Sequence, residues 1–182
     1  TKGCHNGPIV YGLFDGDRLV GACAFACPSS ENVRAAVMGV EYKAHVIELH
    51  RLVVLDEVRA QGFPTSKFVA EALRQFARDF PNYWAVVSYA DTSEGHVGRI
   101  YQATNFIYTG MSGGGATFYR DVDGRLHHPR QCGKNISRAE AALRGWTPER
   151  RGPKHRYVFF LGARVKRRLS LAKLKLPLEA YP

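Results

Sequence analysis

Residues 45–89 read HVIELHRLVVLDEVRAQGFPTSKFVAEALRQFARDFPNYWAVVSY and contain two strand patterns with a helix pattern between them. From about 65 to 79, apolar residues recur at intervals of one, three or four, as on an amphipathic helix that lies on a sheet. Residues 45–55 predict a strand whose alternation breaks at Arg51, which indicates a bulge or a change of burial there. Residues 83–89 are almost continuously apolar, as in a strand covered on both faces. Strand, loop, helix and buried strand together predict a βαβ unit with a right-handed crossover.

Further elements are expected on both sides of this unit. The chain opens with the pattern of a β-hairpin, and a short helix follows it. After the unit, the pattern predicts a short helix, a strand, a glycine turn and a strand pair, and it becomes looser beyond Arg125. The expected ranges are 8–15 and 18–26 for the hairpin, up to 38 for the helix, then 95–103, 105–109, 113–115, 116–120, 137–144 (helix) and 157–161 (strand).

Composition bounds the class of protein. The 182 residues are 45% hydrophobic and 23% charged, which is typical of one compact soluble domain. No apolar run approaches the roughly 18 residues that cross a bilayer, and the first residues hold no hydrophobic signal core. We therefore expect no membrane contact and a cytoplasmic, nucleoid-associated location.

The charge is distributed unevenly. The net charge is +10, and residues 150–175 hold ten basic and no acidic side chains, so the rest of the chain is neutral. Such clustering is typical of a contact with a polyanion, because clustered cations release counterions from a phosphate backbone. A solvated tail that aids solubility is the alternative. We expect a domain at 1–149 and a basic segment at 150–182 that is part of it or packed on it. The candidate nucleic-acid ligands are Arg164, Lys166, Arg167, Arg168, Lys173 and Lys175.

The four cysteines predict neither a disulfide framework nor a zinc ribbon. Cys4, Cys23, Cys27 and Cys132 have no such spacing, and we expect reduced thiols, with Cys23 and Cys27 on one face of a strand in the core. A metal site of Cys132 with His127 and His128 is the alternative, although no second paired motif accompanies it. No metal ligand is assigned.

The loop before the predicted helix at 65–79 is the first candidate site. A helix N-terminus that follows a glycine-containing loop offers unpaired N–H groups and a partial positive charge to a pyrophosphate. Arg59, Gly62 and Thr65 are the candidate cofactor ligands. A purely structural turn is the alternative.

Polar side chains crowd the end of the buried strand and form the second candidate site. Ligands bind at the carboxyl ends of strands in open α/β sheets, so this cluster favours a functional interpretation. Asp91 is a candidate general base or base-orienting group, Tyr101 a candidate acid, and His96 either. A helix cap at Asp91, a core hydrogen bond at Ser88 and a packing role for Tyr101 are the structural alternatives. The cluster comprises Ser88, Tyr89, Asp91, Thr92, His96, Gly98, Tyr101 and Gln102.

The chain resembles a known family through its motifs. The order of elements resembles the GNAT acyltransferase superfamily, an α/β fold with a mixed, splayed central sheet flanked by helices, here with a basic C-terminal extension. The stretches ELHRL at 48–52, TSKF at 65–68 and SYADTSEGHVGRIYQATNFIYTG at 88–110 are similar to the Mom family of phage DNA-modification proteins. CHNG at 4–7 also resembles the HYSG of many relatives, although Asn6 stands where they often carry tyrosine.

The resemblance implies transfer of a carbamoylmethyl group to adenine N6 in double-stranded DNA, which protects a phage genome from restriction. It also implies that Arg51, Asp91, Tyr101 and His5 are catalytic. Ser66, Ser88, Tyr89, His96 and Gln102 are then candidates for substrate binding.

Two acyl donors are compatible with the sequence. The loop keeps Arg59 and Gly62 of the R-x-x-G-x-G/A pattern but carries Pro64 in its last place, so an acetyl-CoA-like thioester is one donor and glycyl-tRNA is the other. Two other functions compete with DNA modification. They are a GNAT N-acetyltransferase of a protein or small amine, and a non-catalytic nucleic-acid-binding module.

Overall fold

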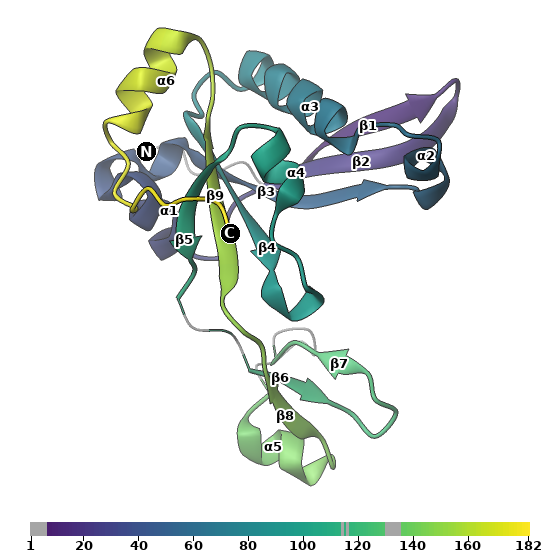
Figure 1. The fold of residues 1–182 in the computed structure, drawn as a ribbon. Coiled ribbons are helices and arrows are strands. Elements are labelled where there is room, and N and C mark those ends of the chain that lie inside the picture. The colour runs from purple at the N-terminus through teal and green to yellow at the C-terminus, as the bar shows by residue number, and fades with distance from the viewer. Residues whose placement is uncertain (1–6, 114, 116, 130–135) are drawn as a thin grey trace. The chain divides into compact units, whose positions relative to one another are not determined.

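The computed structural model describes residues 7–113, 115, 117–129 and 136–182 (Figure 1). The chain divides into two compact units whose segments alternate along the sequence. Unit 1 comprises Thr1–Tyr89, Gly98–Gly110 and Arg156–Pro182, and unit 2 comprises Ala90–Val97 and Met111–His155. His5, which the sequence predicts to be catalytic, lies outside the described residues.

The framework of unit 1 is a six-stranded sheet with the order β1-β2-β3-β4-β9-β5 (Figure 1). β1 pairs antiparallel with β2 and β2 with β3, whereas β3 and β4 are parallel, as a βαβ unit requires. The latest strand in the sequence, β9, therefore lies between two earlier ones. The strands are β1 (Ile9–Asp15), β2 (Arg18–Ala26), β3 (Val46–Val54), β4 (Ala85–Asp91), β5 (Ile107–Met111) and β9 (Lys154–Phe160).

Two irregularities interrupt β3. Opposite β2, the register shifts between Ala24, which pairs with Arg51, and Phe25, which pairs with Leu49, so His50 is the extra residue of a bulge. This confirms the irregularity that the sequence predicts beside Arg51. Opposite β4, the parallel register covers only three pairs, from Val46 with Ala85 to Glu48 with Val87. The two strands therefore separate beyond Glu48, which is the predicted splay.

Helices cover both faces of this sheet. The buried residues of α3 have the predicted helical spacing. Phe76 of α3 stacks on Phe25 of β2 with ring centroids 4.5 Å apart. On the other face, Val37 and Met38 of α1 join Val46, Ala85 and Val158 in one buried cluster. The helices of unit 1 are α1 (Glu31–Met38), the 3₁₀ helix η1 (Val40–His45), α2 (Asp56–Ala60), α3 (Thr65–Asp79), α4 (Arg99–Ala103) and α6 (Arg164–Leu171).

Unit 2 has a smaller core of its own. Its sheet has the order β7-β6-β8, and Tyr119, Ile136 and Ala141 are buried with Trp146 packed against them. Its elements are the 3₁₀ helix η2 (Thr92–Glu94), β6 (Thr117–Arg120), β7 (Leu126–His127), α5 (Arg138–Leu143) and β8 (Thr147–Arg150).

Three expectations about helices need correction. The expected loop at 58–64 begins with the end of α2, whose acidic first-turn residues Asp56 and Glu57 favour a helix N-terminus. The helix expected at 95–103 begins only at Arg99, because Gly95 and Gly98 adopt positive φ angles of 69° and 76°. The helix α6 falls in a region where the sequence predicts no regular element before residue 182 except the strand at 157–161.

The cysteine expectation holds in part. Cys23 is a free thiol and fully buried, as predicted. Cys27 is disulfide-bonded, which corrects the expectation that all thiols are reduced. Cys132 of the alternative metal site lies outside the described residues. His127 pairs with Asp121 and His128 packs edge-on against Phe118, and the described residues hold no group of three metal-ligating side chains.

Candidate functional site

Ser88 lies where β3 and β4 separate. It directly follows Val87, the last residue of β4 in the parallel register, and it is completely buried. Its hydroxyl donates a hydrogen bond of 3.0 Å to the Leu49 carbonyl oxygen of β3. The side chain therefore links the two strands just beyond their last backbone pair, and the predicted core hydrogen bond is present.

Tyr101 of α4 packs beside this point. Its ring lies 5.3 Å from both Phe106 and Tyr157, and 9% of the residue is exposed. Burial raises the pKa of the Tyr101 phenol, and a hydrogen bond with Ser88 offsets part of that increase. The phenol is therefore protonated at neutral pH, the form that can donate a proton, although the raised pKa makes it a weaker acid than an exposed tyrosine.

Tyr157 and Gly98 fix the position of α4. Gln102 donates a hydrogen bond of 3.1 Å from Nε2 to the hydroxyl of Tyr157, which is fully buried on β9. Gly98, the N-cap of α4, has a φ of 76°, and a Cβ there would collide with the Tyr157 ring. Sequence analysis assigned no role to Tyr157, because its contacts to α4 join residues 55 positions apart.

Arg51 and Glu48 lie on either side of the β3 bulge. Arg51 is exposed, and its guanidinium donates to the His50 carbonyl oxygen at 3.3 Å with no carboxylate partner among the described residues. Glu48 is mostly buried, with 17% of its side chain exposed and an oxygen 3.5 Å from His50 Nδ1. Burial, with the Glu48 charge second, raises the pKa of Tyr89 to about 12. Glu48 therefore adds a mostly buried carboxylate to this site, and the sequence pattern alone assigns it no role.

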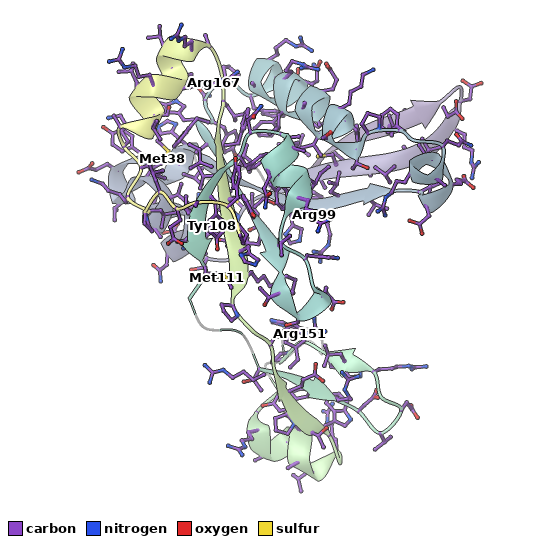
Figure 2. All side chains as sticks on the ribbon, in the orientation of Figure 1. Met38, Arg99, Tyr108, Met111, Arg151 and Arg167 are labelled. Carbon is purple, nitrogen blue, oxygen red and sulfur yellow. The ribbon has the colours of Figure 1, made fainter. Side chains whose placement is uncertain are left out.

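Asp91 is ion-paired in unit 2. Its carboxylate lies 2.9 Å from Lys154 Nζ and 4.0 Å from Arg151 Nη1, and it accepts a hydrogen bond of 3.0 Å from Ser93 N (Arg151 is labelled in Figure 2). Burial acts to raise the pKa of Asp91, but the hydrogen bonds and charges of Lys154, Ser93 and Arg151 outweigh it and lower the pKa overall. A carboxylate held in this way is a weak proton acceptor and a good orienting group.

Asp91 is also the N-cap of η2, so the predicted helix cap is present. Arg151 is also paired with Glu94 at 2.6 Å and lies over the Phe118 ring. His96 has an exposed side chain, and its backbone N–H donates to the Asp91 carbonyl oxygen at 3.1 Å.

The N-terminal turn of α3 can receive an anion in part. No side chain caps the turn, so the N–H groups of Thr65 and Ser66 have no capping acceptor, and Gly62 adopts a φ of 85° with open space around it. Pro64 removes one donor from the cradle. Arg59 bonds to Asp56 at 3.2 Å rather than lying free. The residues therefore fit one phosphate better than a complete pyrophosphate cradle.

The basic segment is partly used for internal contacts. Lys166 donates to the Pro81 and Tyr83 carbonyl oxygens, and burial lowers its pKa. Lys173 donates to the Tyr42 hydroxyl at 2.7 Å, and Arg167 donates to the Gly162 carbonyl oxygen at 2.7 Å. Arg164 and Arg168 on α6 have no hydrogen bond or ion pair within the described part of the chain.

The two units divide the predicted residues between them. Asp91 and His96 belong to unit 2. Unit 1 holds the other described candidates: Arg51, Arg59, Gly62, Thr65, Ser66, Ser88, Tyr89, Tyr101, Gln102 and the basic residues from Arg164 to Lys175. Within unit 1 Tyr101 and Gln102 both contact Tyr157, and Ser88 contacts Tyr101.

Comparison with known proteins identifies the family of this chain. The sequence profile of the Mom protein family matches residues 2–182. The chain belongs to the Mom protein family. A curated relative of this Mom family member is the methylcarbamoylase mom of Escherichia phage Mu, with 26% identity over 184 residues, or 98% of this chain and 73% of the relative.

Solved structures resemble this Mom family member in fold. A variant of the spermidine N-acetyltransferase SpeG from Vibrio cholerae has a TM-score of 0.50 and 12% identity over 85% of this chain and 66% of that one. An acetyltransferase of the GNAT family from Streptococcus pneumoniae has a TM-score of 0.48 and 13% identity over 85% of this chain and 67% of that one. The predicted GNAT-like α/β fold is confirmed. None of the described helices of the Mom family member is long and apolar enough to span a bilayer.

Proposed function

We propose that this Mom family protein transfers a glycyl-derived carbamoylmethyl group to adenine N6 in double-stranded DNA and so protects phage DNA from restriction. The observation that carries the proposal is the similarity to the phage Mu methylcarbamoylase across 98% of the chain. The stretch at 88–110, which carries the strongest resemblance, supplies Ser88, Tyr101 and Gln102, and these side chains gather around Tyr157 in unit 1.

Tyr101 is the proposed acid of the reaction. Acyl transfer to an amine forms an N–C bond, breaks the bond to the donor's leaving group and delivers one proton to that group. The Tyr101 phenol is protonated at neutral pH and is therefore in the form that can donate this proton. Ser88 forms hydrogen bonds with the Tyr101 phenol and with the Leu49 carbonyl oxygen. It therefore fixes the phenol at the point where β3 and β4 separate.

Arg51 and Asp91 have separate proposed roles. The Arg51 guanidinium is exposed beside the bulge and available to stabilise negative charge on the acyl oxygen in the transition state. Asp91 is proposed as an orienting carboxylate rather than the base, because its pKa is lowered by Lys154 and its neighbours. The adenine must leave the base stack before its N6 can react.

The donor is proposed to be a glycyl ester of tRNA or a glycyl thioester that resembles acetyl-CoA. The N-terminal turn of α3, with Thr65 and Ser66, is the proposed contact for a donor phosphate. A glycyl group that reaches N6 needs only an intramolecular rearrangement to become carbamoylmethyl. Purified protein supplied with either donor and with plasmid DNA identifies the donor as the one that yields modified nucleosides.

The test of the function is mass spectrometry of nucleosides from plasmid DNA of cells that express this chain. The proposal requires a heavier adenosine that is absent with Tyr101→Phe and with Asp91→Asn. Unchanged adenosine from cells that contain the folded protein contradicts DNA modification. In that case, turnover of acetyl-CoA with a small amine and without DNA would support an ordinary N-acetyltransferase.

A further inference from the structure

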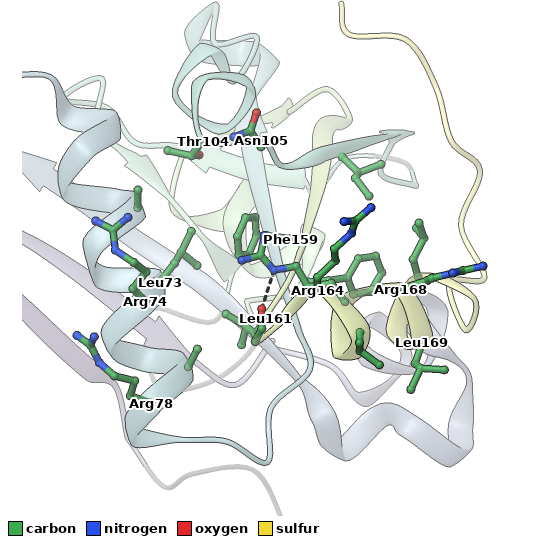
Figure 3. A pocket seen from close by; sticks show the side chains of 18 of the residues that line it. Leu73, Arg74, Arg78, Thr104, Asn105, Phe159, Leu161, Arg164, Arg168 and Leu169 are labelled. Carbon is green, nitrogen blue, oxygen red and sulfur yellow. Dashed lines mark hydrogen bonds between the residues drawn. The ribbon is translucent and has the colours of Figure 1, made fainter.

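Unit 1 contains a large groove whose lining includes none of the side chains gathered around Tyr157. It has a volume of about 1310 Å³ and runs between α3, the end of α4 and α6 (Figure 3). Its α3 wall begins at Ala70 and reaches Arg78, which lies about 20 Å along the helix from Thr65 at the N-terminus. Small-molecule pockets usually hold roughly 300–1,000 Å³, so this space suits a segment of a polymer.

The charged residues of the groove are all cationic. Five arginines and no acidic residue line the groove. Arg74 and Arg78 on α3 are tied to Glu71 or Gln75, whereas Arg164 and Arg168 on α6 have no polar partner among the described residues. Figure 3 shows Arg164 and Arg168 rising from α6 on one side and Arg74 and Arg78 from α3 on the other. The two unpaired guanidinium groups are free to bind phosphates.

The floor of the groove is apolar. Leu73, Phe159 and Leu161 line it, and α6 adds Val165 and Leu169, which are 72% and 61% exposed. The Arg167 guanidinium lies over the Phe159 ring at 5.5 Å, held by its bond to the Gly162 carbonyl oxygen. Guanidinium planes and aromatic rings are surfaces on which unpaired bases stack. An apolar floor with exposed Val165 and Leu169, bordered by arginines of α3 and α6, therefore matches a ligand with both phosphates and base faces.

We propose that the groove between α3 and α6 binds an unpaired stretch of DNA strand, with its phosphates on Arg164 and Arg168 and its bases on the floor at Phe159, Arg167 and Leu169. The inference rests on the proposed function, because an enzyme that modifies adenine in a duplex must hold DNA that is locally opened. A paired duplex shows its bases only at groove edges and cannot lay them on this floor. The groove therefore favours opened over paired DNA.

The test measures binding to the full chain by fluorescence anisotropy. The probes are a labelled single-stranded oligodeoxynucleotide of about 12 nucleotides, within the roughly 4–16 that such grooves cover, and a hairpin duplex of the same sequence. The Arg164→Gln/Arg168→Gln variant should bind the single strand at least tenfold more weakly. The slope of log affinity against log salt should fall by about 1.4, which corresponds to two lost phosphate contacts on a single strand.

Two further variants separate the parts of the proposal. Val165→Asn/Leu169→Asn should weaken single-strand binding severalfold without changing the salt slope, because it removes only apolar contacts. Arg125→Gln/Arg138→Gln removes two exposed arginines of unit 2 and equals the groove variant in net charge. This control should change binding less than twofold. Thermal unfolding of each variant verifies that it folds.

Several results would overturn the inference. They are unchanged single-strand binding in the Arg164→Gln/Arg168→Gln variant, an equal loss in the unit 2 control, an equal loss for the duplex probe, or loss only for a tRNA probe. The same variants scored for nucleoside modification keep the two proposals apart. Modified adenosine with an unaffected groove variant rejects only the groove, whereas groove-dependent binding without any modified adenosine rejects only the proposed reaction.

Discussion

The Tyr101 side chain is a buried phenol that is protonated at neutral pH, and its hydrogen bond with Ser88 offsets part of the pKa increase caused by burial. Tyr101→Phe removes the proton and keeps the ring contacts with Phe106 and Tyr157. We expect modification to fall by about 10²–10⁴, the usual contribution of general acid catalysis. The free energy of unfolding should change by about 1 kcal/mol, the net value of one hydrogen bond. Quantitative nucleoside mass spectrometry and urea unfolding measure the two effects.

Tyr157→Phe is the matched control for this substitution. Tyr157 is also a buried phenol of the same cluster, and its hydroxyl accepts a hydrogen bond from Gln102. The loss of that hydroxyl should affect stability about as much as Tyr101→Phe and leave modification near normal. Equal losses of modification in both variants would assign Tyr101 a packing role.

Gly98 has no room for a side chain, and this leads to a second prediction. Gly98→Ala should destabilise unit 1 by about 3 kcal/mol, since a left-handed residue with a Cβ costs about 1–2 kcal/mol and the collision with Tyr157 adds about 1–3 kcal/mol. Gly95→Ala is the control, because Gly95 has a similar φ of 69° but open space around it. It should cost only the backbone strain of about 1–2 kcal/mol. Urea unfolding followed by far-UV circular dichroism measures both, and equal effects would exclude the collision.

Some residue roles could not be predicted from sequence because their partners are remote. Asp91 was recognised from its position at the end of a strand, yet its pairing with Lys154 joins residues 63 positions apart and changes its proposed role from base to orienting group. Tyr157 was recognised only as part of a strand. Ser88 was predictable as a buried hydroxyl, because a polar residue inside an apolar strand must find a hydrogen-bond partner.

At the scale of elements, periodicity predicted the hairpin, α3, β3 and β4 well, because long apolar patterns dominate there. It misplaced the start of α4, since the positive φ of Gly98 depends on the packing of Tyr157 against it. It missed α6, because the apolar residues of that helix are few and lie on an exposed groove rather than in a core. An amphipathic pattern predicts a helix only where the apolar face is large.

The Asp121–His127 pair gives unit 2 a predicted acid sensitivity. His127 Nε2 lies 2.7 Å from Asp121 Oδ2, and its ring stacks on Trp146 at 4.5 Å. The hydrogen bond from His127 is the main cause that lowers the pKa of Asp121, with burial opposing it and backbone bonds from Arg125 and Asp123 assisting. A carboxyl whose pKa is lower in the folded state stabilises the fold above its unfolded pKa of about 3.9. That contribution is lost as the pH falls through the folded value.

Trp146 fluorescence in a Trp84→Phe background measures this effect, because these are the two tryptophans of the chain. The stability of unit 2 should fall as the pH drops below about 4, and Asp121→Asn should reduce that dependence while lowering stability near pH 7. An Asp121→Asn variant with an unchanged acid transition would contradict the role of the pair.

At the scale of the whole molecule, the net charge of +10 overstates the cations available to a polyanion. Of the ten basic side chains at 150–175, six make polar contacts within the protein. Those that remain without polar contacts in the described part of the chain are Arg150, Arg164, Arg168 and Lys175. We expect the slope of log affinity against log salt for single-stranded DNA to be about −3, whereas ten phosphate contacts would give about −7. A titration between low and physiological salt measures the slope, and a value near −7 would mean that the internal contacts open on binding.

The strand order of unit 1 also has a consequence for synthesis on the ribosome. β9 lies between β4 and β5, but it is made after both. When β5 leaves the exit tunnel, its neighbour in the sheet has not been translated, and the 42 residues 112–153 must emerge first. At roughly 5–20 residues per second, β5 therefore waits seconds with an unpaired edge. During that interval the unpaired edge of β5 can form hydrogen bonds with other polypeptides. The sheet is complete only when β9 has been translated and pairs with β4 and β5.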